Sequence, residues 1–172
     1  MLIKAFATEI KTTYMKAVSL SELKKELQEI PNKELIELCA SLAKYKKDNK
    51  EFLSYLLFEA HDKTAFANEI KAEIDEHITT LKSQPNLYYV KKGLRKLLRS
   101  ITKYSKYIND KATSADLLIC FCSKLKQSGI PYHKSQLIVN MYEQQLKKIN
   151  TLINSLHEDL QQDYLRDLEN LI

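Results

Sequence analysis

Apolar residues recur every three or four positions along nearly all of this 172-residue chain. That spacing is typical of amphipathic helices, because residues three and four apart share one face of an α-helix. The chain holds only two glycines and three prolines, residues that tight turns and strand ends often require. The pattern therefore predicts an all-α protein of seven or eight amphipathic helices, joined by short connections and packed as antiparallel hairpins.

Start and stop signals place the helix boundaries. Ser19, Asp48 and Ser155 are each followed three residues later by glutamate, the pattern of a capping box. Pro31 and the stretch 129–131 stop the helices before them. The expected helices cover about 19–29, 33–47, 50–61, 62–83, 86–109, 114–127 and 133–155, with a short last helix after them. One unbroken helix from 133 to the C-terminus is the alternative for the last part.

Two segments are expected to form the core. Residues 52–58 are apolar nearly all round, which is typical of a central, buried helix. Residues 86–109 carry a single apolar seam instead, and Gly93 beside this seam lets a neighbouring backbone approach closely. Three residues that lie mid-helix in these segments are expected to be fully buried: Leu56, Leu97 and Ile101.

The successive helix pairs 33–47/50–61 and 62–83/86–109 resemble the helical hairpins of HEAT and armadillo solenoids in helix length and loop spacing. The resemblance covers about half of the chain and carries over no functional residue. It implies a short superhelix, a curved helical layer that holds a partner. A closed helical bundle satisfies the same pattern.

The organisation along the chain indicates one folded unit. Met15 opens a stretch that would itself serve as a translation start, so residues 1–14 are expected to be a loosely attached N-terminal extension. Residues 15–172 are expected to form a single all-helical domain, a length that buries about 70% of its unfolded surface.

The amino-acid composition indicates the cellular compartment of the protein. Hydrophobic residues make up 44% of the chain and charged residues 28%, as in average soluble domains. The run of about 20 apolar residues that a membrane span requires is missing, as is the apolar run of a signal peptide. Three cysteines, Cys39, Cys120 and Cys122, are an odd set and make no disulfide framework. We therefore expect a cytoplasmic protein without a membrane span.

Basic residues concentrate on one predicted helix. Residues 77–110 carry eight basic side chains and one acidic one, whereas residues 51–76 carry seven acidic and two basic ones. Five of the basic residues follow spacings of 4, 3, 4 and 3, which puts them on one stripe opposite the apolar seam: Lys92, Lys96, Arg99, Lys103 and Lys106. Arg95 flanks this basic stripe, and Tyr88 and Tyr89 at its start could stack on bases.

The basic stripe is the candidate binding surface for a polyanion, an acidic protein or an anionic lipid head group. The alternative is a solvated helix face whose lysines pair with the acidic helix before it, as is common for charge runs. Lysine outnumbers arginine 24 to 3, which disfavours bidentate recognition of bases. Any contact with nucleic acid is therefore expected to be non-specific.

No motif for catalysis, a cofactor or a metal is found in the sequence. His157-Glu158 begins like a zinc-protease helix, but Gln161 stands where the second histidine is needed. Cys120 and Cys122 have one residue between them, not the two of redox or zinc motifs. The four histidines are expected to be core or capping residues, and one or both of these cysteines to be small core residues.

These observations favour a non-enzymatic helical interaction or scaffold protein without a cofactor. Its partner would be another protein or a second copy of the chain. The alternative is binding of nucleic acid or another polyanion through the basic face of 86–109. An enzyme whose site is assembled between helices is the residual alternative, since such sites leave no linear motif.

Overall fold

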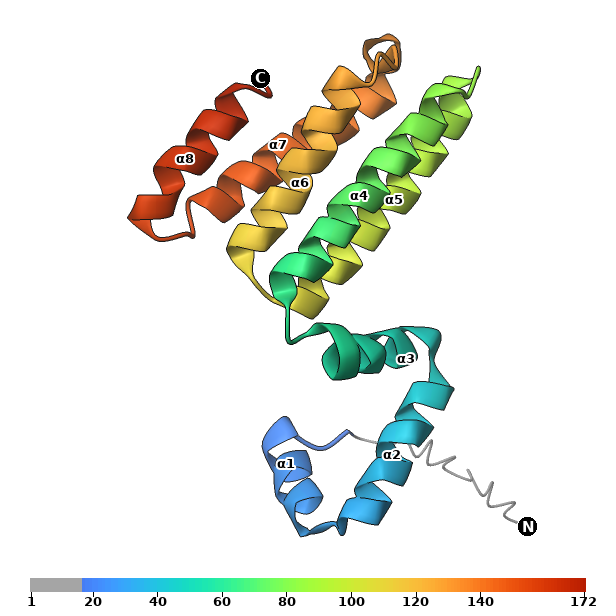
Figure 1. Ribbon diagram of the computed structural model, residues 1–172, viewed down its shortest axis with the longest axis vertical. Coiled ribbons are helices and arrows are strands. Elements are labelled where there is room, and N and C mark those ends of the chain that lie inside the picture. Colours follow the sequence, from blue (N-terminus) through green and yellow to red (C-terminus); the bar gives the residue numbers. More distant parts are fainter. Residues whose placement is uncertain (1–16) are drawn as a thin grey trace, which may run out of the picture. The chain divides into compact units, whose positions relative to one another are not determined.

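The computed structural model describes residues 17–172, and these form eight α-helices, one π-helical turn and one 3₁₀ turn, without any strand (Figure 1). The all-α prediction is therefore confirmed. The elements are α1 (Leu20–Glu29), α2 (Asn32–Tyr45), α3 (Lys47–Ser54), η1 (Tyr55–Glu59), α4 (Lys63–Lys82), α5 (Leu87–Ile108), α6 (Lys111–Gln127), η2 (Tyr132–Lys134), α7 (Gln136–Ile153) and α8 (Glu158–Glu169).

The chain divides into two compact units, one that ends at Lys50 and one that covers Glu51–Ile172. The single domain expected over residues 15–172 stays a prediction. The extension expected over residues 1–14 lies outside the described residues. None of the helices that the structure describes combines the length and apolar composition needed to cross a bilayer.

The first unit contains α1 and α2. At the start of α1 the expected capping box is formed: the Ser19 amide donates to Glu22 Oε2 at 2.9 Å, and the Glu22 amide donates to Ser19 Oγ at 3.3 Å. This arrangement satisfies two amides that a helix start leaves open. Pro31 separates the two helices as predicted. Neither helix buries any of its residues.

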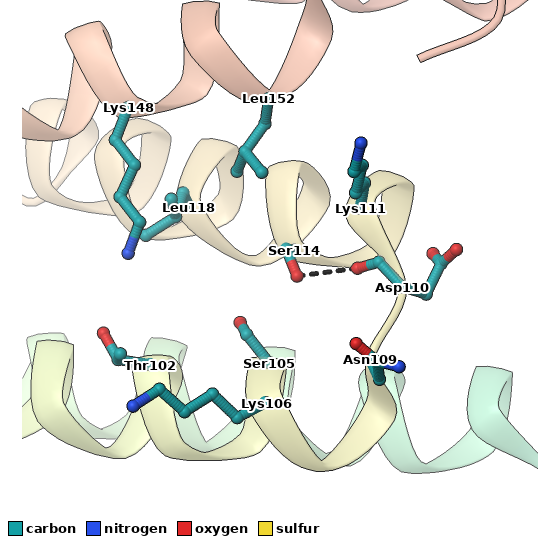
Figure 2. Close-up of a pocket in the computed structure, with 10 residues that line it drawn as sticks. All are labelled: Thr102, Ser105, Lys106, Asn109, Asp110, Lys111, Ser114, Leu118, Lys148 and Leu152. Carbon is teal, nitrogen blue, oxygen red and sulfur yellow. Dashed lines mark hydrogen bonds between the residues drawn. The ribbon is translucent and has the colours of Figure 1, made fainter. Parts of the chain in front are cut away.

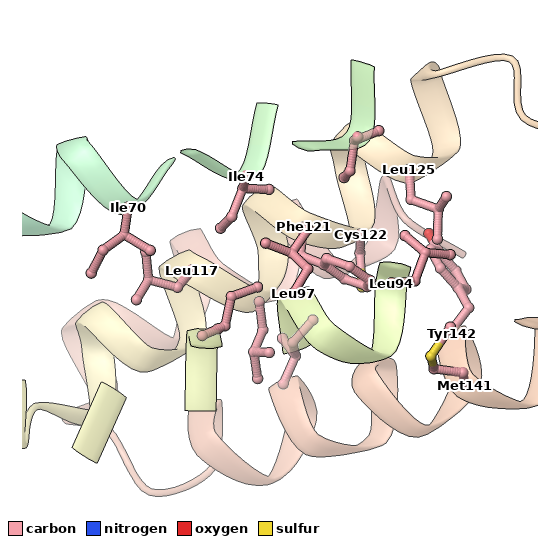
Figure 3. Packing of buried hydrophobic residues seen from close by; sticks show 14 of the residues in the cluster. Ile70, Ile74, Leu94, Leu97, Leu117, Phe121, Cys122, Leu125, Met141 and Tyr142 are labelled. Carbon is pink, nitrogen blue, oxygen red and sulfur yellow. The ribbon is translucent and has the colours of Figure 1, made fainter. Parts of the chain in front are cut away.

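The second unit is built around α6, which packs against α4, α5, α7 and α8. Six of its residues are buried, on more than one side of the helix: Ala115, Leu117, Leu118, Phe121, Cys122 and Leu125. Figure 3 shows Phe121 and Cys122 among side chains from α4, α5 and α7. Burial in this apolar core raises the pKa of the Cys122 thiol to about 12, so the thiol stays neutral, in line with the core role expected for it.

The helices α4 and α5 form an antiparallel hairpin, which agrees with the pair 62–83/86–109 expected from the sequence (Figure 1). The seam of α5 is buried as predicted, with Leu97 and Ile101 at 4% and 1% exposure. The other expected pair, 33–47/50–61, straddles the division between the units and stays a prediction. A solenoid-like stacking of hairpins also stays a prediction.

The prediction of a central, buried helix over residues 52–58 is wrong. The helix changes to a π-helical turn at Tyr55, and in η1 only Tyr55 is buried. Leu56 is 50% exposed, so its predicted burial is wrong as well. An all-round apolar segment can bury only the sides that neighbouring helices cover, and here Phe66 of α4 and Tyr107 of α5 cover the side that carries Tyr55. The central position belongs to α6.

Several helix ends differ from the expected ones by a few residues. Asp110 caps α6 through a 2.7 Å hydrogen bond from the Thr113 amide, so α6 begins three residues before the expected start at residue 114. The expected cap Ser155 instead donates to the Leu152 carbonyl, and His157 is the N-cap of α8. The break between α7 and α8 rules out the unbroken helix from 133 to the C-terminus.

Candidate functional site

The basic stripe on α5 divides into two edges in the structure. The residues Lys92, Lys96, Arg99, Lys103 and Lys106 span about 80° of the helix circumference at 100° per residue. One edge of the stripe faces α7, where Arg99 and Lys106 line surface pockets. The opposite edge carries Lys103, whose ammonium lies 2.5 Å from Glu51 Oε2. The stripe is therefore not one uniform surface.

Lys103 is the member of the stripe whose ammonium is bonded to a carboxylate. Its side chain is only 29% exposed, and its hydrogen bond to Glu51 raises its pKa above the ordinary lysine value. Its ammonium also lies 5.0 Å from the centroid of the Tyr104 ring. The ammonium of Lys103 is thus bonded to a carboxylate that α3 brings to this edge of α5, and a part for Lys103 in polyanion binding stays a prediction.

The other cations of the stripe and the flanking Arg95 remain open to solvent. Lys92, Arg95, Lys96, Arg99 and Lys106 are all exposed, and none of them forms an ion pair among residues 17–172. Asp75, the acidic side chain of α4 that forms an ion pair among the described residues, reaches α6 instead and lies 2.6 Å from Lys124. Pairing with the acidic helix therefore does not neutralise these five cations.

A groove between α5 and α7 is lined by the two arginines of α5. This arginine groove has a volume of about 610 Å³ and is lined by Arg95 and Arg99 from α5 and by Asn140, Gln144 and Gln145 from α7, together with Leu98, Leu137 and Met141. The Arg99 Nε donates to the Arg95 carbonyl at 3.3 Å, which orients the guanidinium along the helix. Guanidinium and amide donors in one groove suit phosphate and carboxylate oxygens.

A second pocket, which we call the lysine pocket, lies farther along α5, where this helix meets α6 and α7 (Figure 2). Lys106 lies seven residues, or about 10 Å, beyond Arg99 on the same face of the helix. Lys106, Lys111 and Lys148 line the pocket from three different helices. Sequence reasoning had not connected Lys148 with α5, because the two meet only through the packing of α7 beside α6.

The two tyrosines at the start of α5 are exposed, as expected from the sequence. Their rings contact each other edge to face at 5.4 Å between centroids, and the ammonium of Lys91 lies 5.2 Å from the centre of the Tyr88 ring. Tyr132 of η2, in contrast, stacks on Tyr142 at 5.5 Å between ring centroids and packs against the core. Unlike Tyr132, Tyr88 and Tyr89 therefore present open aromatic faces at the start of α5.

The histidines are scattered over the described residues. His157 caps α8, as the expected capping role requires, and its Nδ1 lies 3.1 Å from Asp159 Oδ2. His61 and His133 are exposed and are not core residues. Within residues 17–172, no three histidine, cysteine, aspartate or glutamate side chains come together as a metal site.

No protein-family model, no curated protein and no solved structure matches this chain. The candidate surfaces therefore rest on the geometry of this chain alone.

Proposed function

We propose that the protein is a non-enzymatic helical interaction or scaffold protein of the cytoplasm. The observation that carries this proposal is the apolar face of α1 and α2, two helices that bury none of their own residues. Ile36 is 69% exposed and Leu42 60% exposed, although both lie in amphipathic helix α2. Covering a leucine or isoleucine side chain contributes about 1.5–3 kcal/mol, so a partner helix laid on this face gains stability.

The partner proposed for α2 is an amphipathic helix of another protein or of a second copy of the chain. The experiment compares Leu42→Lys with Ser41→Lys in the full chain. Both variants add the same charge to neighbouring positions of α2, but Ser41 lies about 100° around the helix from the apolar position. Light scattering over a concentration series measures self-association, and affinity capture with quantitative mass spectrometry measures other partners.

The proposal expects Leu42→Lys to lose the self-association or the captured partner, and Ser41→Lys to keep it. A chain that stays monomeric and captures the same proteins with both variants would contradict the proposal. Circular dichroism of each variant checks that the helices remain formed.

A second candidate function is the binding of nucleic acid or another polyanion through α5. The observation that favours it is the set of exposed cations that have no ion-pair partner among residues 17–172, with Arg95 and Arg99 in the arginine groove. Log affinity should then fall against log salt with a slope of about −0.7 per contacted phosphate of a single strand, or about −0.9 for a duplex.

The test is fluorescence anisotropy with a labelled single strand and a labelled duplex across a salt series. Replacing Arg95 and Arg99 by glutamine should flatten the slope by about one to two. Lys103→Gln is the matched control, since its ammonium is already bonded to Glu51. Absence of binding at low salt, or equal slopes for the arginine variant and the control, would rule out this candidate.

A further inference from the structure

The lysine pocket between α5, α6 and α7 is large enough for a small ligand. Its volume is about 340 Å³, within the range of about 300–1,000 Å³ that small-molecule sites occupy. Its wall combines charged, hydroxyl and apolar groups. Lys106 and Lys148 supply positive charge, Thr102 and Ser105 supply hydroxyls, and Leu118 and Leu152 supply an apolar side.

Two lysines from different helices direct their ammonium groups to the same end of this pocket. Figure 2 shows Lys148 reaching from α7 toward α5, and Lys106 extending along α5 to the end of the pocket that carries Thr102. Neither lysine forms an ion pair in the described part of the chain. Lys111 also lines the pocket, but its ammonium points away from it in Figure 2.

Among residues 17–172, the carboxylate that lines the pocket is that of Asp110, and it does not neutralise this end. Figure 2 shows the Asp110 carboxylate turned to the opposite side, away from Thr102. It accepts the Thr113 amide at 2.7 Å, a hydrogen bond that holds the pKa of Asp110 below its ordinary value. Asp110 is therefore occupied as the N-cap of α6, and the charge between Lys106 and Lys148 stays positive.

The hydroxyl groups of Thr102 and Ser105 also line the pocket. The Ser105 hydroxyl has no hydrogen-bond partner among residues 17–172, whereas the Thr102 hydroxyl donates to the Leu98 carbonyl at 2.8 Å and keeps its lone pairs. Two ammonium groups and a hydroxyl donor match a compact dianion with several acceptor oxygens. Leu118 and Leu152 form an apolar wall against which the organic part of such a ligand can pack.

We propose that the lysine pocket binds a phosphate monoester, with the phosphate between Lys106 and Lys148 and its organic part against Leu118 and Leu152. Such a group is present on a small phosphorylated metabolite, such as a mononucleotide, and at the phosphorylated end of a nucleic-acid strand. The site is separate from the apolar face of α1 and α2, so it does not depend on the interaction proposed there.

Isothermal titration calorimetry on the full chain tests the site with adenosine monophosphate, adenosine and inorganic phosphate at constant ionic strength. The monophosphate should bind at least tenfold more tightly than adenosine. Lys148→Gln and Lys106→Gln should each weaken that binding at least tenfold. Lys147→Gln is the matched control, because Lys147 is exposed on the same helix but does not line the pocket.

A second series of titrations uses a short single-stranded nucleic acid with and without a 5′-phosphate. A preference of at least tenfold for the phosphorylated strand, abolished by Lys148→Gln, assigns the monoester to a nucleic-acid end. Binding of the mononucleotide without that preference assigns it to a small metabolite. Binding should also weaken below about pH 6, where the phosphate monoester dianion takes up a proton and becomes a monoanion.

The proposal is overturned if adenosine and its monophosphate bind equally, or if neither binds. It is also overturned if Lys148→Gln and Lys147→Gln have the same effect. The substituted lysines lie at the surface, and thermal unfolding followed by circular dichroism shows whether each variant keeps the fold.

Discussion

Gly93 of α5 lies directly against Leu81 of α4: a β-carbon built on Gly93 would stand 2.3 Å from Leu81 Cδ2 and 3.2 Å from Leu81 Cγ. The glycine therefore permits a close approach of the two helices, as the sequence predicted, although the neighbouring group is a side chain and not a backbone. Leu81 is 8% exposed, so it has little room to turn away.

We expect Gly93→Ala to lower the free energy of unfolding by about 1 kcal/mol. Overpacking a core costs about 1–3 kcal/mol. The higher helix propensity of alanine relative to glycine offsets up to about 1 kcal/mol of this overpacking cost. Denaturant unfolding followed by circular dichroism measures the change.

Truncating the neighbour should reverse the sign of that effect. In the background of Leu81→Ala the clash is removed, so adding Gly93→Ala should stabilise the chain by up to about 1 kcal/mol. The double-mutant cycle isolates this coupling. A Gly93→Ala effect of the same size and sign in both backgrounds would show that the two residues do not constrain each other.

Core truncations should separate α5 from η1. Leu97→Ala and Ile101→Ala should each cost about 2–5 kcal/mol, because both side chains are enclosed in the seam of α5. Leu56→Ala should cost less than about 0.5 kcal/mol, the usual scale for an exposed position. Urea unfolding of the three variants checks the ranking. An equal cost at Leu56 and Leu97 would contradict the exposure of η1.

A buried tyrosine should make the fold sensitive to alkali. The Tyr142 hydroxyl donates to the Leu171 carbonyl at 3.0 Å, and burial raises the pKa of Tyr142 well above its ordinary value. The folded state thus keeps a proton that the unfolded chain releases above about pH 10. Stability from this group is fully present below that pH and is lost as the pH rises toward the folded pKa.

Tyr142→Phe tests this assignment with two independent readouts. Near neutral pH it should cost about 1 kcal/mol for the lost hydrogen bond to Leu171. Above about pH 10 it should make the decline in stability shallower, because one raised pKa is gone. Tyr88→Phe is the control, since Tyr88 is exposed and should change neither quantity. A decline that keeps its slope in Tyr142→Phe would assign the alkaline loss to other groups.

Local signals in the sequence predicted most helices because they act within one helical turn. The Ser19–Glu22 capping box, the stop at Pro31 and the seam through Leu97 and Ile101 all need only near neighbours. The burial of residues 52–58 could not be predicted in this way. An all-round apolar segment does not tell which of its sides another helix will cover.

The candidate site shows the same division between local and long-range information. Helix periodicity placed the basic residues of α5 on one stripe, which the structure keeps. Pairing of Lys103 with Glu51 spans 52 positions, and Lys148 reaches the lysine pocket from α7. Those two facts depend on how helices pack, and no spacing within one helix encodes them.

The ion pair between Glu51 and Lys103 should contribute a measurable coupling that vanishes at high pH. Both side chains are about two-thirds buried, and their double-mutant cycle with glutamine should give a coupling of about 0.2–1 kcal/mol near neutral pH. The hydrogen bond to Glu51 raises the pKa of Lys103 above its ordinary value of 10.5. The contribution of this ion pair to stability is therefore complete below that pH and is lost as the pH rises through the higher folded pKa of Lys103.

Urea unfolding of the wild type, the two single variants and the double variant, near neutral pH and above about pH 11, measures the coupling itself. The effect of tyrosine titration on stability is common to all four chains and cancels within the cycle. A coupling that persists unchanged above the lysine pKa, or that is absent at neutral pH, would show that this contact does not hold α3 to α5.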